Sequence, residues 1–149
     1  MPLVPIAELL LYCADRAQHV AEVVRPALAA GRIVVCDRFS DSTIAYQGYG
    51  RGLDLDALRA MDARARDGLA PHLTLLLDCP VEVGLRRARQ RSAAGDRFER
   101  ETVEFHERVR AGFLALARGE PARFRVLDAT APIDDIRRRV TAEVEARLS

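Results

Sequence analysis

A short apolar run ends in two charged residues, Asp37 and Arg38, and polar side chains follow them directly. The run is Val34-Val35-Cys36, and the polar residues that follow are Ser40, Ser42, Thr43, Tyr46 and Gln47. If the run is a strand of a parallel sheet, its carboxyl end is where ligands collect. An Arg there can clamp a phosphate group through two hydrogen bonds, and an Asp can act on a metal-bound phosphate. The alternative is a strand end closed by a surface ion pair.

Arginines are dense in a second segment, at positions Arg86, Arg87, Arg89, Arg91, Arg97 and Arg100. Such a cluster repels itself unless an anion binds, so the segment is a candidate phosphate-binding site. The alternative is a solvated helix end in which Glu82, Asp96 and Glu99 are the partners. All 23 residues counted as Lys or Arg are arginines. A Walker A loop requires a Lys, so this sequence contains none.

Tyr12 and Arg16 lie four positions apart, so a helix would place both on one face. A shared face allows the two side chains to act together. A tyrosine in the core and a solvated arginine are the alternative.

Strand and helix patterns alternate along the chain and would position these side chains. Apolar runs predict strands over 33–36, 73–77 and 124–127. Helical spacing predicts helices over 7–28, 55–66, 81–89, 102–118 and 136–148. Gly31 ends the first helix, and Asp54 caps the start of the second. The alternation predicts an α/β fold with a parallel sheet and helices on both faces.

The residues from Asp37 to Gln47 resemble the Asp-Arg-Tyr/Phe/His…Ser-x-x-Ala-Tyr-Gln signature of thymidylate kinases, which transfer a phosphoryl group from ATP to dTMP. The resemblance extends from about Ala7 to the end of the chain. It implies that Arg38 binds the dTMP phosphate, and that Asp37 lies near the transferring phosphoryl group and holds Mg²⁺ through water. The other implied dTMP-binding residues are Tyr12 on the thymine ring, Arg16 at O4, Thr43 at N3, Tyr46 beside the deoxyribose, Ser42 and Gln47.

Residues 86–100 resemble the mobile lid of the bacterial enzymes. The resemblance implies that Arg91 and Arg97 stabilise charge on the transferring phosphate, and that Arg89 contacts the nucleotide. The segment Asp128-Ala129-Thr130 resembles the loop that borders the adenine ring of ATP. The segment can also be a cap for the last helix, and the two roles are compatible.

The resemblance implies a P-loop nucleoside-monophosphate-kinase-like fold of three layers, with strand order 2-3-1-4-5. The three expected strands match strands 3, 4 and 5, so we expect an N-terminally truncated fold, with strands 1 and 2 and the phosphate loop missing. Residues 1–149 would then be one partial domain. Its sheet would either have a gap in its middle or be repaired, with altered helix packing. We expect no activity from the chain alone.

Two other interpretations remain open: a non-catalytic dTMP-binding remnant, or the product of a mis-started reading frame. A deoxynucleoside kinase is less favoured, because such enzymes lack the Ala-Tyr-Gln run.

Composition sets the remaining expectations. A chain of 149 residues that is 49% hydrophobic can bury a core, and a net charge of +1 creates no field that attracts nucleic acid or anionic membranes. Three well-separated cysteines suit buried thiols in a reducing compartment. We expect a cytoplasmic protein without a membrane segment. The family resemblance implies a homodimer that pairs through the long first helix.

Overall fold

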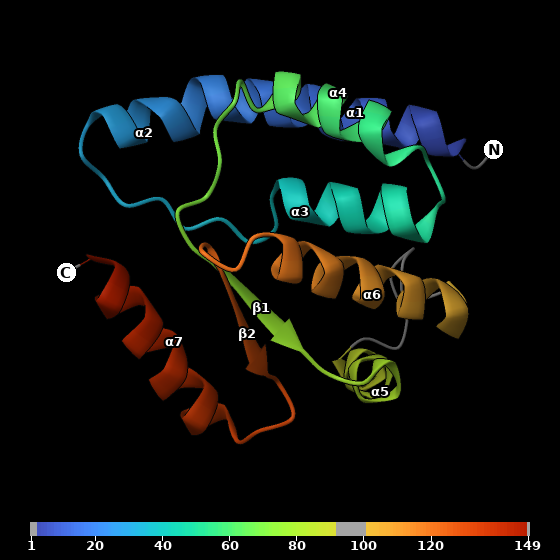
Figure 1. Ribbon diagram of the computed structural model, residues 1–149, viewed down its shortest axis with the longest axis vertical. Coiled ribbons are helices and arrows are strands. Elements are labelled where there is room, and N and C mark those ends of the chain that lie inside the picture. Colours follow the sequence, from blue (N-terminus) through green and yellow to red (C-terminus); the bar gives the residue numbers. More distant parts are fainter. Residues whose placement is uncertain (1–2, 92–100, 149) are drawn as a thin grey trace. The chain divides into compact units, whose positions relative to one another are not determined.

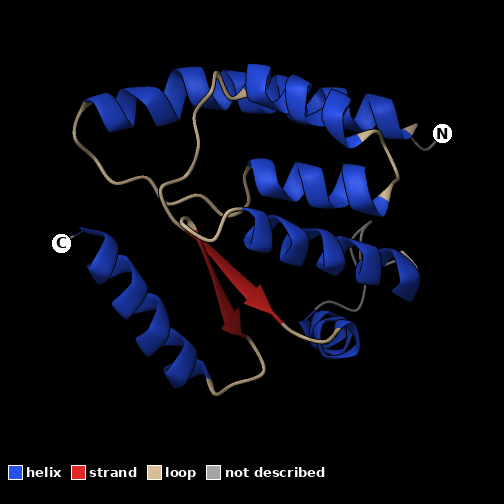
Figure 2. Ribbon diagram, in the orientation of Figure 1, coloured by secondary structure: helices blue, strands red, loops and turns tan. Residues whose placement is uncertain are grey.

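The computed structural model describes residues 3–91 and 101–148 (Figure 1). Two compact units follow one another along the chain, Met1–Ala70 and Pro71–Ser149. The first unit is helical, and the strands belong to the second (Figure 2). The expected strand and lid residues therefore divide between the units, and each unit is described by itself.

The first unit begins with the predicted long helix, which the structure confirms as three consecutive segments. These are α1 (Pro5–His19), the π-helical η1 (Val20–Val24) and α2 (Arg25–Ala29). The helix ends at Gly31, as predicted. Gly31 has a φ of 70°, and the amide of Arg32 donates to the carbonyl of Ala27 at 3.0 Å. Glycine adopts this left-handed conformation without steric cost, which is why the chain turns here.

A helical segment that the sequence analysis did not predict follows the Asp-Arg pair. It consists of α3 (Ser40–Thr43) and the π-helical η2 (Ile44–Gly50). Wide turns of this kind often occur at functional sites. The predicted helix α4 (Leu55–Ala65) comes next, and the Asp54 carboxylate accepts from the amide of Ala57 at 2.8 Å, which confirms the predicted cap. A Cβ atom at Gly48 would lie 2.5 Å from the Leu55 side chain, so a larger residue there would force Leu55 to shift.

The predicted strand over 33–36 is wrong, because these residues form a loop between α2 and α3 (Figure 2). Ile33 is 70% exposed and Val35 is 93% exposed. A strand forms only where a neighbouring chain accepts its backbone hydrogen bonds. Within residues 3–91 and 101–148, no strand pairs with this run. An apolar, β-branched sequence was therefore insufficient to make a strand.

The second unit contains two parallel strands, β1 (Thr74–Asp78) and β2 (Phe124–Asp128), which confirm two of the three predicted strands. Thr74 pairs with Phe124, and Asp78 pairs with Asp128, so both strands end at the same edge. The predicted helices are α5 (Val81–Arg91), α6 (Val103–Gly119) and α7 (Ile133–Leu148). Helix α6 contacts both strands and α5, whereas α7 contacts β2 (Figure 1). The described sheet is thus a strand pair, not a three-stranded sheet with a gap or a repair.

Buried apolar side chains hold the second unit together. Phe105, Val109 and Leu116 recur along one face of α6, and Phe124 and Leu127 lie on β2. Thr102 caps α6 by accepting from the amide of Phe105 at 3.2 Å. No helix among the described residues is both long and apolar enough to span a membrane.

Candidate functional site

A buried carboxylate, Asp62 on α4, connects three elements of the first unit. Its Oδ1 atom accepts from Nη1 of Arg16 on α1 at 2.7 Å. Its Oδ2 atom accepts from the hydroxyl of Ser40 on α3 and from Nε of Arg66 at 3.0 Å. The Asp62 side chain is 2% exposed. Burial of a carboxylate is tolerated here because both oxygens have charged or polar donors.

The Arg16 guanidinium lies at the centre of this cluster. Nη1 also donates to the hydroxyl of Thr43 at 2.8 Å, and Cζ lies 5.3 Å from the centroid of the Phe39 ring. The side chain is 11% exposed. Two of the predicted base-binding residues, Arg16 and Thr43, are therefore brought into direct contact. Burial raises the pKa of the neighbouring Cys13 thiol, the Asp62 charge raises it further, and Arg16 partly offsets this.

Two other predicted residues meet on the loop and the helix that follow. Arg38 has a φ of 66°, a conformation that is rare for a residue with a side chain. Its Cζ atom lies 5.0 Å from the centroid of the Tyr46 ring. Asp37 and Arg38 are both exposed, whereas Ser42 and Tyr46 are half-buried. Tyr12 lies on the same face of α1 as Arg16 and is 38% exposed. Cationic and aromatic groups are therefore open to solvent beside the buried cluster.

Gln47 differs from the other predicted residues because it is only 1% exposed. Its amide nitrogen donates to Oε1 of Glu8 at 2.7 Å. The Arg51 guanidinium lies 3.8 Å from the same oxygen. Glu8 and Gln47 thus join α1 to η2 from within the unit.

The cysteines only partly follow the expectation of buried thiols. Cys36 is exposed, and its Sγ donates to the carbonyl of Arg38 at 3.1 Å. Cys13 and Cys79 are half-buried, and all three are free. Cys36 lies in the loop that replaces the predicted strand over 33–36.

In the second unit, each strand ends in an aspartate with its own partner. Asp78 receives two hydrogen bonds from Arg110 of α6, at 2.7 and 3.0 Å. Hydrogen bonding to Asp78, together with attraction to its charge, raises the pKa of Arg110. Asp128 accepts from the hydroxyl of Thr130 at 2.6 Å and from its amide at 2.8 Å, and these bonds lower the pKa of Asp128. Asp128 therefore closes a turn, and α7 begins five residues later at Ile133, so the predicted cap for α7 is wrong.

The buried Ala129 connects this turn to its surroundings. Its amide donates to the carbonyl of Asp78 at 2.7 Å, and its carbonyl accepts from Nη1 of Arg87 at 2.7 Å. Arg89 is exposed on α5. Arg91 ends that helix, and its side chain is not described; Arg97 lies outside the described residues.

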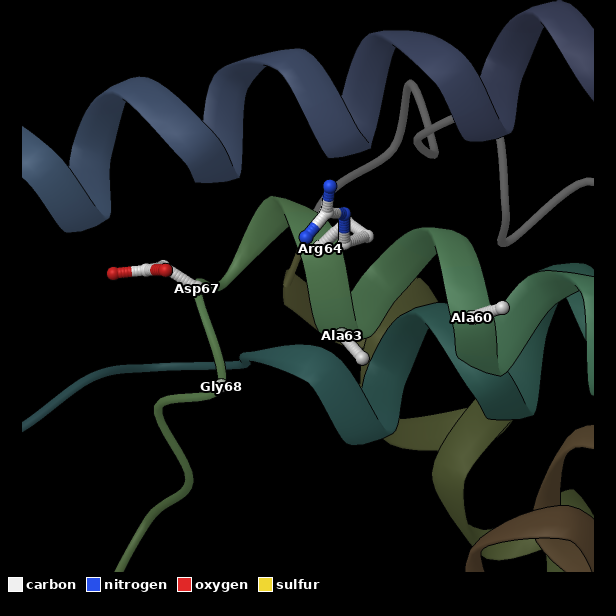
Figure 3. A pocket seen from close by; sticks show the side chains of 5 residues that line it. All are labelled: Ala60, Ala63, Arg64, Asp67 and Gly68. Atoms are coloured by element: carbon white, nitrogen blue, oxygen red, sulfur yellow. The ribbon is translucent and has the colours of Figure 1, made fainter.

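A shallow hollow occurs elsewhere in the first unit, at the end of α4 (Figure 3). It is lined by Ala60, Ala63, Arg64, Asp67 and Gly68 and has a volume of about 480 Å³. Asp67 is paired with Arg25 at 2.6 Å. The lining contains none of the predicted site residues. Within the described part of the chain, no group of three or more His, Cys, Asp or Glu residues forms a metal-binding cluster.

Comparison with known proteins decides the family. The thymidylate kinase family model matches residues 2–140. The chain belongs to the thymidylate kinase family. It is 57% identical over 148 residues to the thymidylate kinase of Desulfovibrio desulfuricans, covering 95% of this chain and 68% of that protein. It is 62% identical over 135 residues to that of Solidesulfovibrio magneticus, covering 87% and 64%.

A solved structure agrees with this family. The thymidylate kinase of Ehrlichia chaffeensis has a TM-score of 0.68 and 33% identity, with 85% of this chain and 60% of that chain covered. The expected P-loop nucleoside-monophosphate-kinase-like α/β fold is confirmed. The chain spans about two thirds of the length of these thymidylate kinases.

Sequence reasoning missed several residues that contact the predicted site residues or Asp62. These are Glu8, Phe39, Ser40 as a donor to Asp62, Asp62 itself, and Arg66. A usable signal existed for one of them. Asp62 lies four positions after the buried Leu58, so helical spacing places it on the buried face of α4. A carboxylate at such a position needs partners, and the nearby arginines were available.

Proposed function

We propose that this chain carries the acceptor-binding and lid portion of an ATP-dependent dTMP kinase, which transfers a phosphoryl group from ATP to dTMP and yields dTDP. The observation that carries the proposal is the contact of Arg16 with Thr43, because it joins two residues that the family signature places against thymine. An Arg donor and a hydroxyl match the O4 and N3 atoms of thymine. Tyr12 lies one helical turn before Arg16 and would stack on the ring.

The phosphate end of dTMP would lie at Arg38. A guanidinium binds phosphate through two parallel hydrogen bonds, and the nearby Tyr46 ring orients this group. Tyr46 would also wall off the deoxyribose, and Ser42 would complete the pocket. Gln47 would act indirectly, because its hydrogen bond to Glu8 holds η2 against α1. Binding would depend on a backbone conformation that places Arg38 at an unusual φ.

The remaining assignments concern ATP and the metal. Asp37 offers one exposed carboxylate, which suits Mg²⁺ because this ion is held by one or two carboxylates, waters and substrate phosphates. When bound, Mg²⁺ neutralises charge on the phosphates. Arg89, Arg91 and Arg97 would contact the transferring phosphate, and Asp128, Ala129 and Thr130 would border the adenine. We expect a cytoplasmic homodimer that binds neither nucleic acid nor membranes.

The exposed apolar side chains of the first helix are the support for a dimer. Leu10, Leu11 and Val23 are 51%, 58% and 52% exposed. Burial of such side chains in a partner contributes about 25 cal/mol per Å² of apolar surface.

A non-catalytic dTMP-binding protein is the second candidate. It is favoured by the absence of lysine from the 149 residues, because ATP-binding P-loops use a Lys on the phosphates. Both candidates bind dTMP and neither is expected to form ADP alone, and only the kinase portion would form ADP once an ATP-binding P-loop segment is joined to it.

Isothermal titration with dTMP tests the acceptor site. Arg38→Ala removes a charge-assisted contact worth about 1.5–3 kcal/mol, so we expect affinity to fall about 10- to 150-fold. Arg32→Ala, at an exposed arginine earlier in the same loop, is the matched control and should bind like the parent. Equal affinities of Arg38→Ala and the parent would remove Arg38 from the site.

A further inference from the structure

The arrangement around Asp62 links a buried charge to the group expected to read the base. Its three donors come from α1, α3 and the residue that follows α4, and two of them are arginines. Asp62 is 1% exposed, so it touches no solvent-borne ligand itself. Whatever Asp62 contributes to recognition must therefore act through its neighbours.

The neighbour with a direct route to ligand is Arg16. Nη1 of Arg16 carries two hydrogens, and its two acceptors are Asp62 at 2.7 Å and Thr43 at 2.8 Å. The Phe39 ring lies against the guanidinium carbon at 5.3 Å. A planar group held by two bonds at one nitrogen and by a ring keeps a single orientation. Its Nε and Nη2 donors are then fixed in direction as well.

We propose that Asp62 is a positioning residue that sets the preference for a 4-oxo over a 4-amino pyrimidine, by fixing Arg16 and Thr43. This inference rests on the proposed function. A guanidinium can only donate, so it matches a 4-oxo group, which accepts, and it opposes a 4-amino group, which donates. A site with fixed donors rejects a ligand that leaves them unpaired. Without Asp62, Arg16 can turn away, and the opposition to the amino group weakens.

The variant that tests this is Asp62→Asn, with dTMP and dCMP as probes in titration calorimetry. The amide keeps the size of the side chain but removes its charge and one acceptor. We expect dTMP affinity to fall about tenfold or more, and the ratio of dTMP to dCMP affinity to move toward one. An unchanged ratio would overturn the proposal.

The variant Leu58→Ala distinguishes a positioning role of Asp62 from a general contribution to stability. Leu58 lies on the same helix, is 1% exposed and contributes to the core rather than to the polar cluster. Its truncation lowers the melting temperature, and we expect the dTMP to dCMP ratio to stay at the parent value. If the ratio falls as far in Leu58→Ala as in Asp62→Asn, loss of stability explains both and the proposal fails.

A double-mutant cycle tests whether Asp62 acts through Arg16. In the Arg16→Met background, Asp62→Asn should change the ratio no further, because the group that it positions is gone. An equal further loss in that background would contradict the route through Arg16.

A ligand-free measurement keeps the two proposals distinguishable. The Nε–H signal of Arg16 in ¹⁵N NMR should show restricted motion in the parent and rapid averaging in Asp62→Asn. If the parent binds neither nucleotide, the proposed function fails, and this signal alone decides whether Asp62 holds the guanidinium. An Arg16 signal that is unaffected by the substitution overturns the positioning role.

Discussion

The two units of the chain differ in what they bury. Among the described residues, the buried polar or charged side chains all belong to Met1–Ala70: Glu8, Ser40, Asp41, Thr43, Gln47 and Asp62. The buried side chains of Pro71–Ser149 are apolar, and ion pairs such as Arg110 with Asp78 remain partly exposed. The first unit thus buries polar groups beside apolar ones such as Leu9 and Leu58, whereas the buried side chains described in the second unit are apolar.

A buried polar network and an apolar core suit different tasks. A buried polar network is stable only when every member has its partner, so its geometry is restricted. Such restriction suits the recognition of one nucleotide. An apolar core tolerates variation in shape, which suits a scaffold that carries charged groups on its surface.

The largest expected effect concerns phosphoryl transfer, because neither unit contains a Walker A lysine. We expect the purified 149-residue polypeptide to form no detectable ADP from ATP, Mg²⁺ and dTMP. Its sequence has no lysine and therefore no Walker A motif to hold the ATP phosphates. A coupled assay beside the intact Desulfovibrio desulfuricans thymidylate kinase measures this. Turnover close to that of the relative would show that arginines of these units replace the missing lysine.

The next effect tests the difference between the interiors directly. Asp62→Leu in the first unit should cost about 3–5 kcal/mol, because it leaves Arg16 and Arg66 without their carboxylate. Leu116→Met in the second unit exchanges one buried apolar side chain for another and should cost less than about 1.5 kcal/mol. Urea denaturation followed by circular dichroism gives both values.

Asp56→Leu is the control for that comparison. Asp56 lies on the same helix as Asp62, but its side chain is 96% exposed. Its replacement should change stability by no more than about 0.5 kcal/mol. If Asp62→Leu proves equally mild, the polar interior of the first unit does not hold its helices together.

The sequence predicted the elements whose signals are local. Five helices and two strands formed where periodicity placed them, and the Asp54 cap and the Gly31 stop were also found. The strand over 33–36 failed because its formation depends on a partner, not on its own residues. The helix over 40–50 was missed because glycine and hydroxyl residues are poor helix formers. Packing of Gly48 against Leu55 and the bond from Gln47 to Glu8 stabilise it instead.

The site was predictable only where the family signature names a residue. Arg16 and Thr43 were expected in one pocket, and they are in contact. Asp62 and Glu8 were not expected, because a single acid on an amphipathic helix usually faces solvent. Their hydrogen-bond partners on other helices come from 22 to 46 residues away in the sequence, so only the folded chain reveals them.

The smallest expected effect lies in the second unit and is a pH dependence. Two hydrogen bonds from Thr130 lower the pKa of the exposed Asp128 below its ordinary value of 3.8. A lowered pKa means that this carboxylate stabilises the fold above about pH 4 and loses that contribution as pH falls through its folded-state pKa. Thr130→Val removes the hydroxyl bond but keeps the backbone bond.

The urea midpoint of Thr130→Val should therefore lie slightly below that of the parent above pH 5, and the two should converge as pH falls below about 4. Thr141→Val, at an exposed position in α7, is the matched control and should parallel the parent at every pH. Because Asp128 is exposed, solvent screening keeps the difference between the two urea midpoints small. The loss of stability expected for Asp62→Leu is large by contrast. A constant offset between Thr130→Val and the parent from pH 2.5 to 6 would mean that the hydroxyl stabilises the turn without coupling to the charge of Asp128.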